Sequence, residues 1–141
     1  GEPMKPLTKV ASGGELSRIM LALKSIFSEE EGITSIIFDE VDTGVSGRAA
    51  QAMAEKIFHL SAHSQVFCIT HLPQVAAMAD THLYIVKAEN NHRTTTVVHA
   101  LKEDERINEV GRMISGASMT DLTKRHAKEL LELATQMKAT S

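Results

Sequence analysis

The stretch from Ser35 to Gly47 constrains the fold more than any other part of the chain. It opens with a short apolar run, Ile36 to Phe38, and then places two carboxylates side by side at Asp39 and Glu40. A short run rich in β-branched residues is typical of a strand buried on both faces, as in a parallel sheet. Adjacent carboxylates are costly to bury without partners, so the strand is expected to end at a polar site. In an open α/β sheet, ligands bind at the carboxyl ends of the strands.

Two interpretations of the paired acids follow from the residues. In the first, Asp39 serves a metal ion and Glu40, which faces the other way, acts on a water molecule. In the second, the strand ends in two solvated acids, which is a common arrangement and carries no chemistry. The stretch taken alone leaves both interpretations open.

Length and composition indicate one globular domain. A chain of 141 residues can bury a useful core, and no apolar run approaches the ~20 residues that a membrane span requires. The first six residues lack the charged and apolar regions of a signal peptide. The single cysteine, Cys68, has no partner for an internal disulfide, which favours a reducing cytoplasmic setting and a buried, inert thiol. The net charge of −3 and the absence of Trp do not indicate direct DNA binding by this chain.

A glycine-rich turn opens the first predicted helix. Ser12 is a natural N-cap, and Glu15 completes a capping box around Gly13 and Gly14. Glycine lets an anion approach the backbone, and the unpaired N–H groups of a helix N-terminus favour negative charge, so the turn can contact a phosphate. It is equally a well-capped helix with no ligand. Apolar residues then recur at spacings of three and four to about Ser28, predicting a helix with one buried face: Leu16, Ile19, Met20, Leu23, Ile26 and Phe27.

The rest of the chain alternates strands with helices, which predicts an α/β fold. The segment from Glu29 to Gly32 is expected to be a solvated loop. A second buried strand is expected to end on Thr70 and His71, again placing polar residues at a strand's carboxyl end. That strand is expected over 65–70. The other expected elements are a helix with Ala50, Met53, Ala54, Ile57 and Phe58 on one face, a short helix 73–79, a hairpin of strands 83–87 and 94–101, a helix ending before Gly116, and a last helix capped by Ser118.

Three elements in fixed order resemble the ABC-type ATPase head. They are Ser12-Gly13-Gly14-Glu15, similar to the signature motif; Asp39-Glu40, similar to the end of the Walker B strand; and His71, similar to the switch histidine. The resemblance implies the fold class: the parallel-sheet lobe of a P-loop NTPase, with a C-terminal hairpin and helices. It spans nearly the whole chain, so residues 1–141 are expected to form one C-terminal lobe.

Details place the resemblance within one branch of these ATPases. Transporter subunits usually carry Gln at the position of Glu15 and Pro at the position of Val41, which counts against the alternative of a transporter's nucleotide-binding subunit. Asp-Glu-Val-Asp, ending at Asp42, looks like the SMC-like branch of chromosome maintenance proteins with long coiled coils. Within that branch, three stretches are very similar to a family of bacterial DNA repair proteins: 10–24, 39–50 and 68–77.

One departure from the pattern is important. The chain has no Gly-x-x-x-x-Gly-Lys-[Ser/Thr] motif, since none of its eight glycines is followed by lysine. In P-loop NTPases this Walker A element cradles the phosphates and supplies a hydroxyl to Mg²⁺. The family carries it in an N-terminal lobe beyond a long coiled coil, so this chain looks like half a catalytic head that is inactive alone.

The resemblance implies a role for each motif residue. Asp39 would join the Mg²⁺ shell, through water, and Glu40 would deprotonate the attacking water. His71 would hydrogen-bond the γ-phosphate of ATP. The signature residues would bind the γ-phosphate of ATP held by a second head, and Asp42 would lie at the contact between heads. The residues expected to contact nucleotide are Ser12, Gly13, Gly14, Glu15 and Asp42.

The implied partners follow from these roles. They are the N-terminal Walker A lobe of the same protein and a second ATPase head in a homodimer, with DNA reached through the full-length protein and no membrane involved. The implied function is ATP hydrolysis in recombinational repair of DNA double-strand breaks, in the cytoplasm at the nucleoid. A third possibility is an interaction module that kept the fold without the chemistry.

Overall fold

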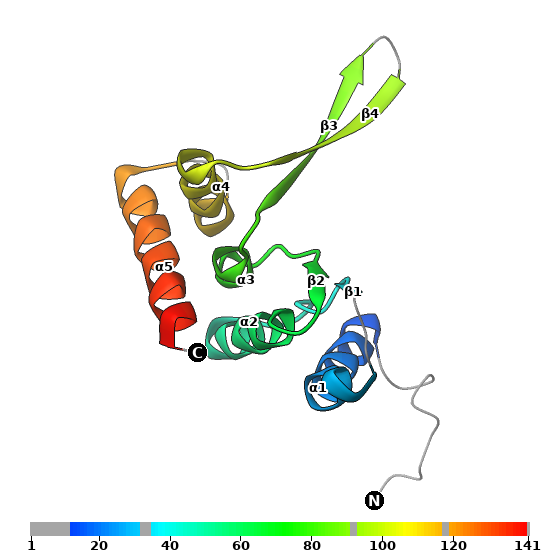
Figure 1. Ribbon diagram of the computed structural model, residues 1–141. Coiled ribbons are helices and arrows are strands. Elements are labelled where there is room, and N and C mark those ends of the chain that lie inside the picture. The colour runs from blue at the N-terminus through cyan, green and yellow to red at the C-terminus, as the bar shows by residue number, and fades with distance from the viewer. Residues whose placement is uncertain (1–11, 32–34, 91–92, 117–118, 141) are drawn as a thin grey trace, which may run out of the picture. The chain divides into compact units, whose positions relative to one another are not determined.

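The computed structural model describes residues 12–31, 35–90, 93–116 and 119–140. The predicted extended segment from Gly1 to Val10 lies outside them, as do Gly32 and Ser118. The elements, in chain order, are α1 (Gly13–Glu31), β1 (Ser35–Phe38), α2 (Gly47–Ser61), β2 (Gln65–Cys68), α3 (Pro73–Met78), β3 (Leu83–Asn90), β4 (Arg93–Ala100), α4 (Glu103–Ser115) and α5 (Asp121–Thr140) (Figure 1). The fold is therefore mixed α/β. The chain divides into two compact units within α3, the first ending at Val75 and the second starting at Ala76.

The first unit is built on a parallel pair of strands. The two strands are parallel, as the sequence predicts, and β1 pairs with β2 from Ser35 opposite Gln65 to Phe38 opposite Cys68. The pairing extends one step further, because the Ile69 N–H donates to the Phe38 carbonyl at 2.9 Å. The helix α2 contacts both α1 and β2. It presents its predicted face to the core: Ala50, Met53, Ala54 and Ile57 are buried, whereas Phe58 is only half-buried.

The predicted burial of the strands on both faces is wrong for this chain. Phe38 is buried, but the side chains of Ile37, Phe67 and Ile69 are 71%, 42% and 54% exposed. Successive side chains of a strand point to opposite faces, so one face of the two-stranded sheet is covered and the other is bare. The apolar run was correctly assigned to a strand, but only one of its faces has a partner within the described residues.

The predicted face of α1 is wrong in the same sense. Leu21 is buried at 5% exposure, while five of the six residues expected to face the core are exposed at 39–69%: Ile19, Met20, Leu23, Ile26 and Phe27. The helix also continues through Glu31 where a loop was expected to begin at Glu29. Glutamate is a good helix former, and neither Gly nor Pro occurs between Glu15 and Glu31.

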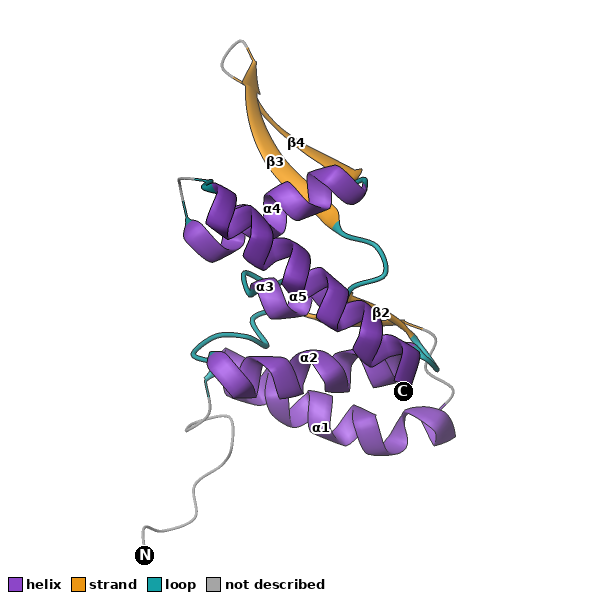
Figure 2. Cartoon of the chain, turned by 90° about the vertical axis from the view of Figure 1, so that its left-hand side faces the viewer, coloured by secondary structure: helices purple, strands orange, loops and turns teal. Residues whose placement is uncertain are grey.

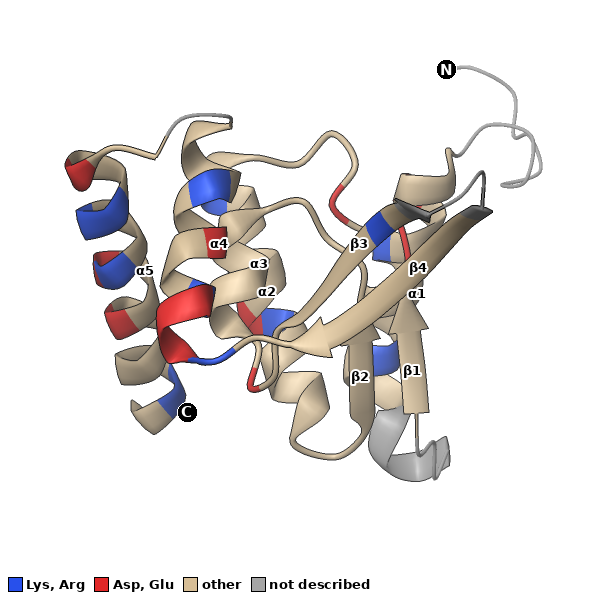
Figure 3. Ribbon diagram, turned by 90° about the horizontal axis from the view of Figure 1, so that it is seen from above, with Lys and Arg blue, Asp and Glu red and all other residues tan. Residues whose placement is uncertain are grey.

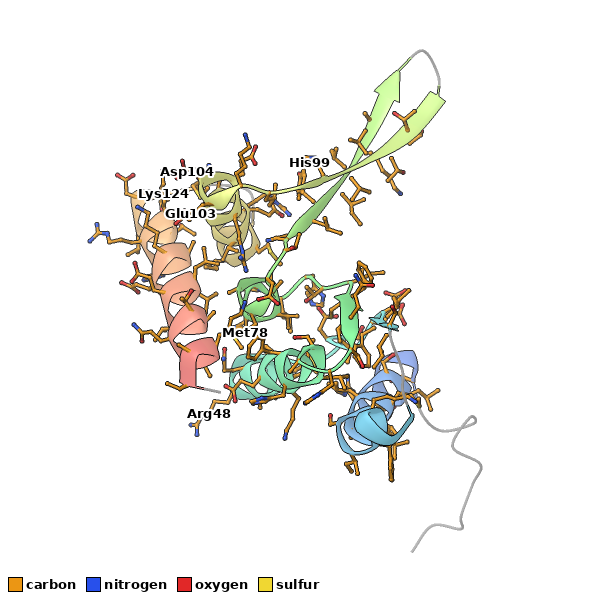
Figure 4. All side chains as sticks on the ribbon, viewed as in Figure 1. Arg48, Met78, His99, Glu103, Asp104 and Lys124 are labelled. Atoms are coloured by element: carbon orange, nitrogen blue, oxygen red, sulfur yellow. The ribbon has the colours of Figure 1, made fainter. Side chains whose placement is uncertain are left out.

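The second unit joins a hairpin to two helices. β3 and β4 pair antiparallel, which confirms the predicted hairpin, and Tyr84 lies opposite His99 with ring centroids 5.5 Å apart (Figure 4). The helices α4 and α5 contact each other, and Figure 2 shows them side by side. Gly111 of α4 lies at this contact: a Cβ there would lie 3.7 Å from the Ala127 Cβ of α5 and 2.7 Å from the sulfur of Met119, which precedes α5. Both acidic and basic residues occur along α5 (Figure 3).

Helix ends in the second unit are closed by side chains. Gly116 ends α4 with φ 78°, a positive value that glycine adopts readily, and its N–H donates to the Arg112 carbonyl. The cap of α5 is Thr120, whose hydroxyl accepts the Thr123 N–H at 3.2 Å; this corrects the expectation that Ser118 is the cap. Arg106 of α4 donates from Nη2 to carbonyls at the end of α3: those of Ala76, Ala77 and Ala79. That guanidinium therefore supplies donors to carbonyls at the C-terminal end of α3.

Cys68 is partly buried in β2, which raises the pKa of its thiol to about 12 from the usual 9.0 because burial disfavours the thiolate. The nearby Asp42 and Asp39 carboxylates act in the same direction. We expect Cys68 to react far more slowly with a thiol reagent at pH 8 in the folded chain than in urea, since the thiolate is the nucleophile. The unfolded chain loses this proton first, so stability should fall as pH rises from 9 towards 12. Rapid labelling of the folded chain at pH 8 would contradict this.

Candidate functional site at the strand ends

The predicted site residues of the first unit meet at the carboxyl ends of the parallel strands. The segment that follows β1 lies against the first turn of α1. Ser17 donates its hydroxyl to the Asp39 carbonyl at 2.9 Å, and Arg18 donates from Nη1 to the Thr43 carbonyl at 2.8 Å and the Val41 carbonyl at 3.3 Å. These bonds attach the loop after β1 to the helix that starts at the glycine-rich turn.

The two glycines of that turn make room for Glu40. A Cβ on Gly13 would lie 2.8 Å from Glu40 Oε2, and a Cβ on Gly14 would lie 2.9 Å from the Glu40 carbonyl oxygen. Real Cβ atoms do not approach oxygen this closely, so Gly14, which faces backbone, needs glycine, whereas a Cβ on Gly13 would have to displace the Glu40 carboxylate. The Cβ position of Gly14 also lies 3.0 Å from Thr43 Cβ. The candidate catalytic carboxylate therefore rests on the N-terminal turn of α1.

Glu40 has an unusual backbone. Its φ is 58°, the only positive φ at a non-glycine residue among those the structure describes. The left-handed region is disfavoured for residues with a Cβ and costs on the order of 1–3 kcal/mol, and such residues cluster at functional sites. The turn it opens is closed by the Thr43 N–H, which donates to the Glu40 carbonyl at 3.2 Å. The bonds from Ser17 and Arg18 on either side hold this conformation in place.

The capping box at the start of α1 has the predicted form. The Ser12 N–H donates to Glu15 Oε2 at 2.7 Å, and the Glu15 N–H donates to the Ser12 hydroxyl at 3.3 Å. The hydrogen bonds from the backbone and hydroxyl of Ser12 lower the pKa of the Glu15 carboxyl. Glu15 is exposed, and its carboxylate is engaged in this cap. The cap is the one of the two interpretations of the turn that needs no ligand. Its contact with nucleotide stays a prediction.

Asp42 and His71 form the second half of the site. The Asp42 side chain is only 3% exposed, and its Oδ2 lies 3.0 Å from His71 Nδ1. The same oxygen accepts the Thr70 hydroxyl at 2.6 Å and the His71 backbone N–H at 2.9 Å. The imidazole is 71% exposed, so the ring is held on one edge and open on the other. The Asp42 carboxylate thus points into the protein, and its predicted position at a contact between heads remains untested.

The contacts that Ser17, Arg18 and Thr70 make in this site were not predicted, although the sequence positions of these residues point towards it. Ser17 and Arg18 stand four residues after Gly13 and Gly14, so they lie on the same face of α1. Thr70 directly precedes His71 at the strand end, where it adds a hydroxyl to the polar set. Asp39 is exposed at the end of β1, where its side chain can meet a cation.

Outside this site, the described residues bear on three further features: metal sites, hollows and membrane-spanning helices. No group of three or more His, Cys, Asp or Glu side chains that could hold a metal ion occurs in the parts of the chain that the structure describes. A hollow of about 420 Å³ lies in the second unit between the hairpin and α4, and its lining includes Tyr84, His99 and Leu101. None of the helices in the described ranges is long and apolar enough to cross a bilayer.

Together, the fold and the site define a mixed α/β protein whose acids, glycine-opened helix and histidine converge at the ends of a parallel strand pair. No family model matches the chain. It is 71% identical over 98% of its length to "DNA repair protein RecN" of Halalkalibacterium halodurans, 69% over 99% to that of Bacillus subtilis, and 46% over 93% to that of Treponema pallidum. This chain is therefore a fragment of a RecN-family protein. It spans 24%, 24% and 23% of the length of these relatives.

Proposed function

We propose that the chain, residues 1–141, is the C-terminal lobe of an ABC-type ATPase head in a RecN protein. In that role it contributes to ATP binding and hydrolysis during recombinational repair of DNA double-strand breaks, in the cytoplasm at the nucleoid. The observation that supports this most is the meeting of Glu40 with Gly13 and Gly14 at the strand ends. Relatives named for DNA repair add support, and nothing in them favours the transporter alternative.

The arrangement suits phosphoryl transfer, which depends on positioning and charge stabilisation. Mg²⁺ neutralises phosphate charge when bound, and Asp39, whose carboxylate is exposed at the end of β1, fits an ion that keeps several waters and takes few carboxylates. Glu40 is the general base for the attacking water. His71 offers its open ring edge to the γ-phosphate. ATP itself is held mainly by the Walker A lobe, which this chain lacks.

The signature turn serves a second head in this proposal. Ser12, Gly13 and Gly14 contact the γ-phosphate of nucleotide held by the partner head of a homodimer. Splitting the catalytic groups between two protomers makes hydrolysis report on dimerisation, which can then move a coiled coil that contacts DNA. The exposed apolar residues on β1, β2 and α1 support the view that this unit lacks covering segments supplied elsewhere in the protein.

The test is ATP turnover by this chain alone and after titration with a separately made N-terminal portion of the same protein. We expect no turnover from the chain alone, and turnover that rises with the added portion and saturates at equimolar amounts. A control titration uses an N-terminal portion whose Walker A lysine is replaced by alanine. Turnover by the chain alone, persisting through purification, would mean that it carries a different nucleotide site, and the proposal would be wrong.

A further inference from the structure

The Asp42 carboxylate is buried, and its Oδ2 is engaged by neighbours beyond the end of β2. Oδ2 accepts hydrogen bonds from the Thr70 hydroxyl and the His71 N–H at 2.6 and 2.9 Å, and the His71 ring Nδ1 lies 3.0 Å from it. Burying a carboxylate is expensive unless it is paired and hydrogen-bonded. The Thr70 hydroxyl and the His71 backbone N–H supply these hydrogen bonds, and neither depends on the imidazole ring. The carboxylate is thus a fixed acceptor against which the ring can be oriented.

The contact determines what the ring can offer. The carboxylate has no proton to donate, so a ring nitrogen 3.0 Å from its oxygen is stabilised by a proton on Nδ1 rather than by a lone pair there. The other nitrogen, Nε2, then belongs to the open edge of a side chain that is 71% exposed. A second proton on Nε2 makes it a donor to a phosphate oxygen, with the Asp42 charge as the counter-ion. An imidazole held at one edge by a buried acid is oriented for work at the other.

We infer that Asp42 is a positioning residue for His71: it holds the imidazole with Nδ1 protonated and presents Nε2 outward to the γ-phosphate. This inference rests on the proposed function and adds to it a residue that acts through His71. The Thr70 hydroxyl donates to the same Asp42 oxygen and accepts the Leu72 N–H at 3.0 Å, so Thr70 contacts the carboxylate but not the imidazole ring. The loop after β1, which carries Glu40, is in this way tied to the histidine loop after β2.

The first test reads the histidine tautomer directly. Long-range ¹H–¹⁵N spectra of the ¹⁵N-histidine-labelled chain distinguish protonated from unprotonated ring nitrogens, and His71→Gln identifies the His71 signals. We expect wild-type His71, when neutral, to carry its proton on Nδ1. Asp42→Asn should lose that preference, since the amide can turn its NH₂ group to Nδ1 and favour a proton on Nε2. A neutral wild-type ring protonated on Nε2 would overturn the inference, whether or not the variant folds.

The second test separates positioning from stability in the full-length protein. Asp42→Asn is expected to lower kcat for ATP by about 10- to 100-fold, the usual cost of losing a residue that orients a histidine from behind. KM should change little, because the other lobe holds most of the nucleotide. Thr70→Val is the matched control: it removes a donor to the same oxygen but leaves the ring contact, and should lower kcat much less. Equal losses of kcat in the two variants would mean that Asp42 is merely structural.

The two tests distinguish the failure of this inference from failure of the proposed function. Absence of ATP turnover by the full-length protein would defeat the proposed function, while the tautomer spectra would still decide whether Asp42 orients His71. Turnover together with a wild-type ring protonated on Nε2 would defeat only the positioning role.

Discussion

Replacing Glu40 by glutamine in the full-length protein should lower ATP turnover by about 10²- to 10⁴-fold, the range expected for loss of a positioned general base. Glutamine has the same shape and can keep the place beside Gly13, but it cannot take a proton from water. The Glu40 side chain is exposed, so the melting temperature should hardly change. Nucleotide binding should persist, since the Walker A lobe supplies most of it. Steady-state turnover and nucleotide titration of the same preparations measure both effects.

Glu15→Gln is the matched control for this experiment. It makes the same chemical change at an acid of the signature turn, a position where transporter subunits usually carry Gln, and glutamine can still complete the capping box with Ser12. Turnover of Glu15→Gln should stay close to that of the wild type. A Glu40→Gln protein that retains turnover within a few-fold of wild type would show that Glu40 is not the base, and the mechanism would have to use another group.

Gly14→Ala should destabilise the chain by about 2–3 kcal/mol, the upper part of the range for overpacking. The new methyl would lie 2.9 Å from the Glu40 carbonyl oxygen and 3.0 Å from Thr43 Cβ. Neither atom can move without displacing the loop that Arg18 holds. Thermal unfolding followed by circular dichroism measures the loss, as a melting temperature lower by several degrees.

Gly13→Ala provides the comparison. The atom in its way is Glu40 Oε2, the free end of a flexible side chain, so the methyl should displace the carboxylate and leave the fold nearly as stable. The two neighbouring substitutions therefore separate backbone packing from side-chain placement. If Gly14→Ala melts at the wild-type temperature, the close approach of α1 to the loop after β1 is not a determinant of stability.

Much of the fold follows from local sequence pattern. The parallel strands, the buried face of α2 and the hairpin were predictable because periodicity and turn residues encode them directly. The exposure of Ile37 and of the apolar side chains along α1 was not predictable from the sequence of this chain. An apolar pattern indicates which side chains favour burial but not whether a covering segment is present, and this chain spans only about a quarter of the length of its relatives. The same physical rule therefore gave correct elements and incorrect exposure.

The site was predictable where strand ends decide it. Asp39, Glu40 and His71 follow strands, and parallel strands bring their carboxyl ends to one edge of a sheet. The inward direction of Asp42 depends on the left-handed turn at Glu40, which interrupts the alternation of side chains along an extended chain. No sequence pattern predicts that turn, because glutamate does not favour the left-handed backbone conformation that Glu40 adopts. The Asp42–His71 contact thus required the tertiary structure.

The left-handed backbone at Glu40 has a consequence for how this position can vary. Glycine would adopt φ 58° without strain, and asparagine more readily than glutamate, so a search for stability alone would replace Glu40. In the proposed mechanism, chemistry and conformation make opposite demands at Glu40, because the general base must stay although its backbone is strained. Engineering that raises the melting temperature of this protein is therefore expected to find its easiest gains at the position where activity has most to lose.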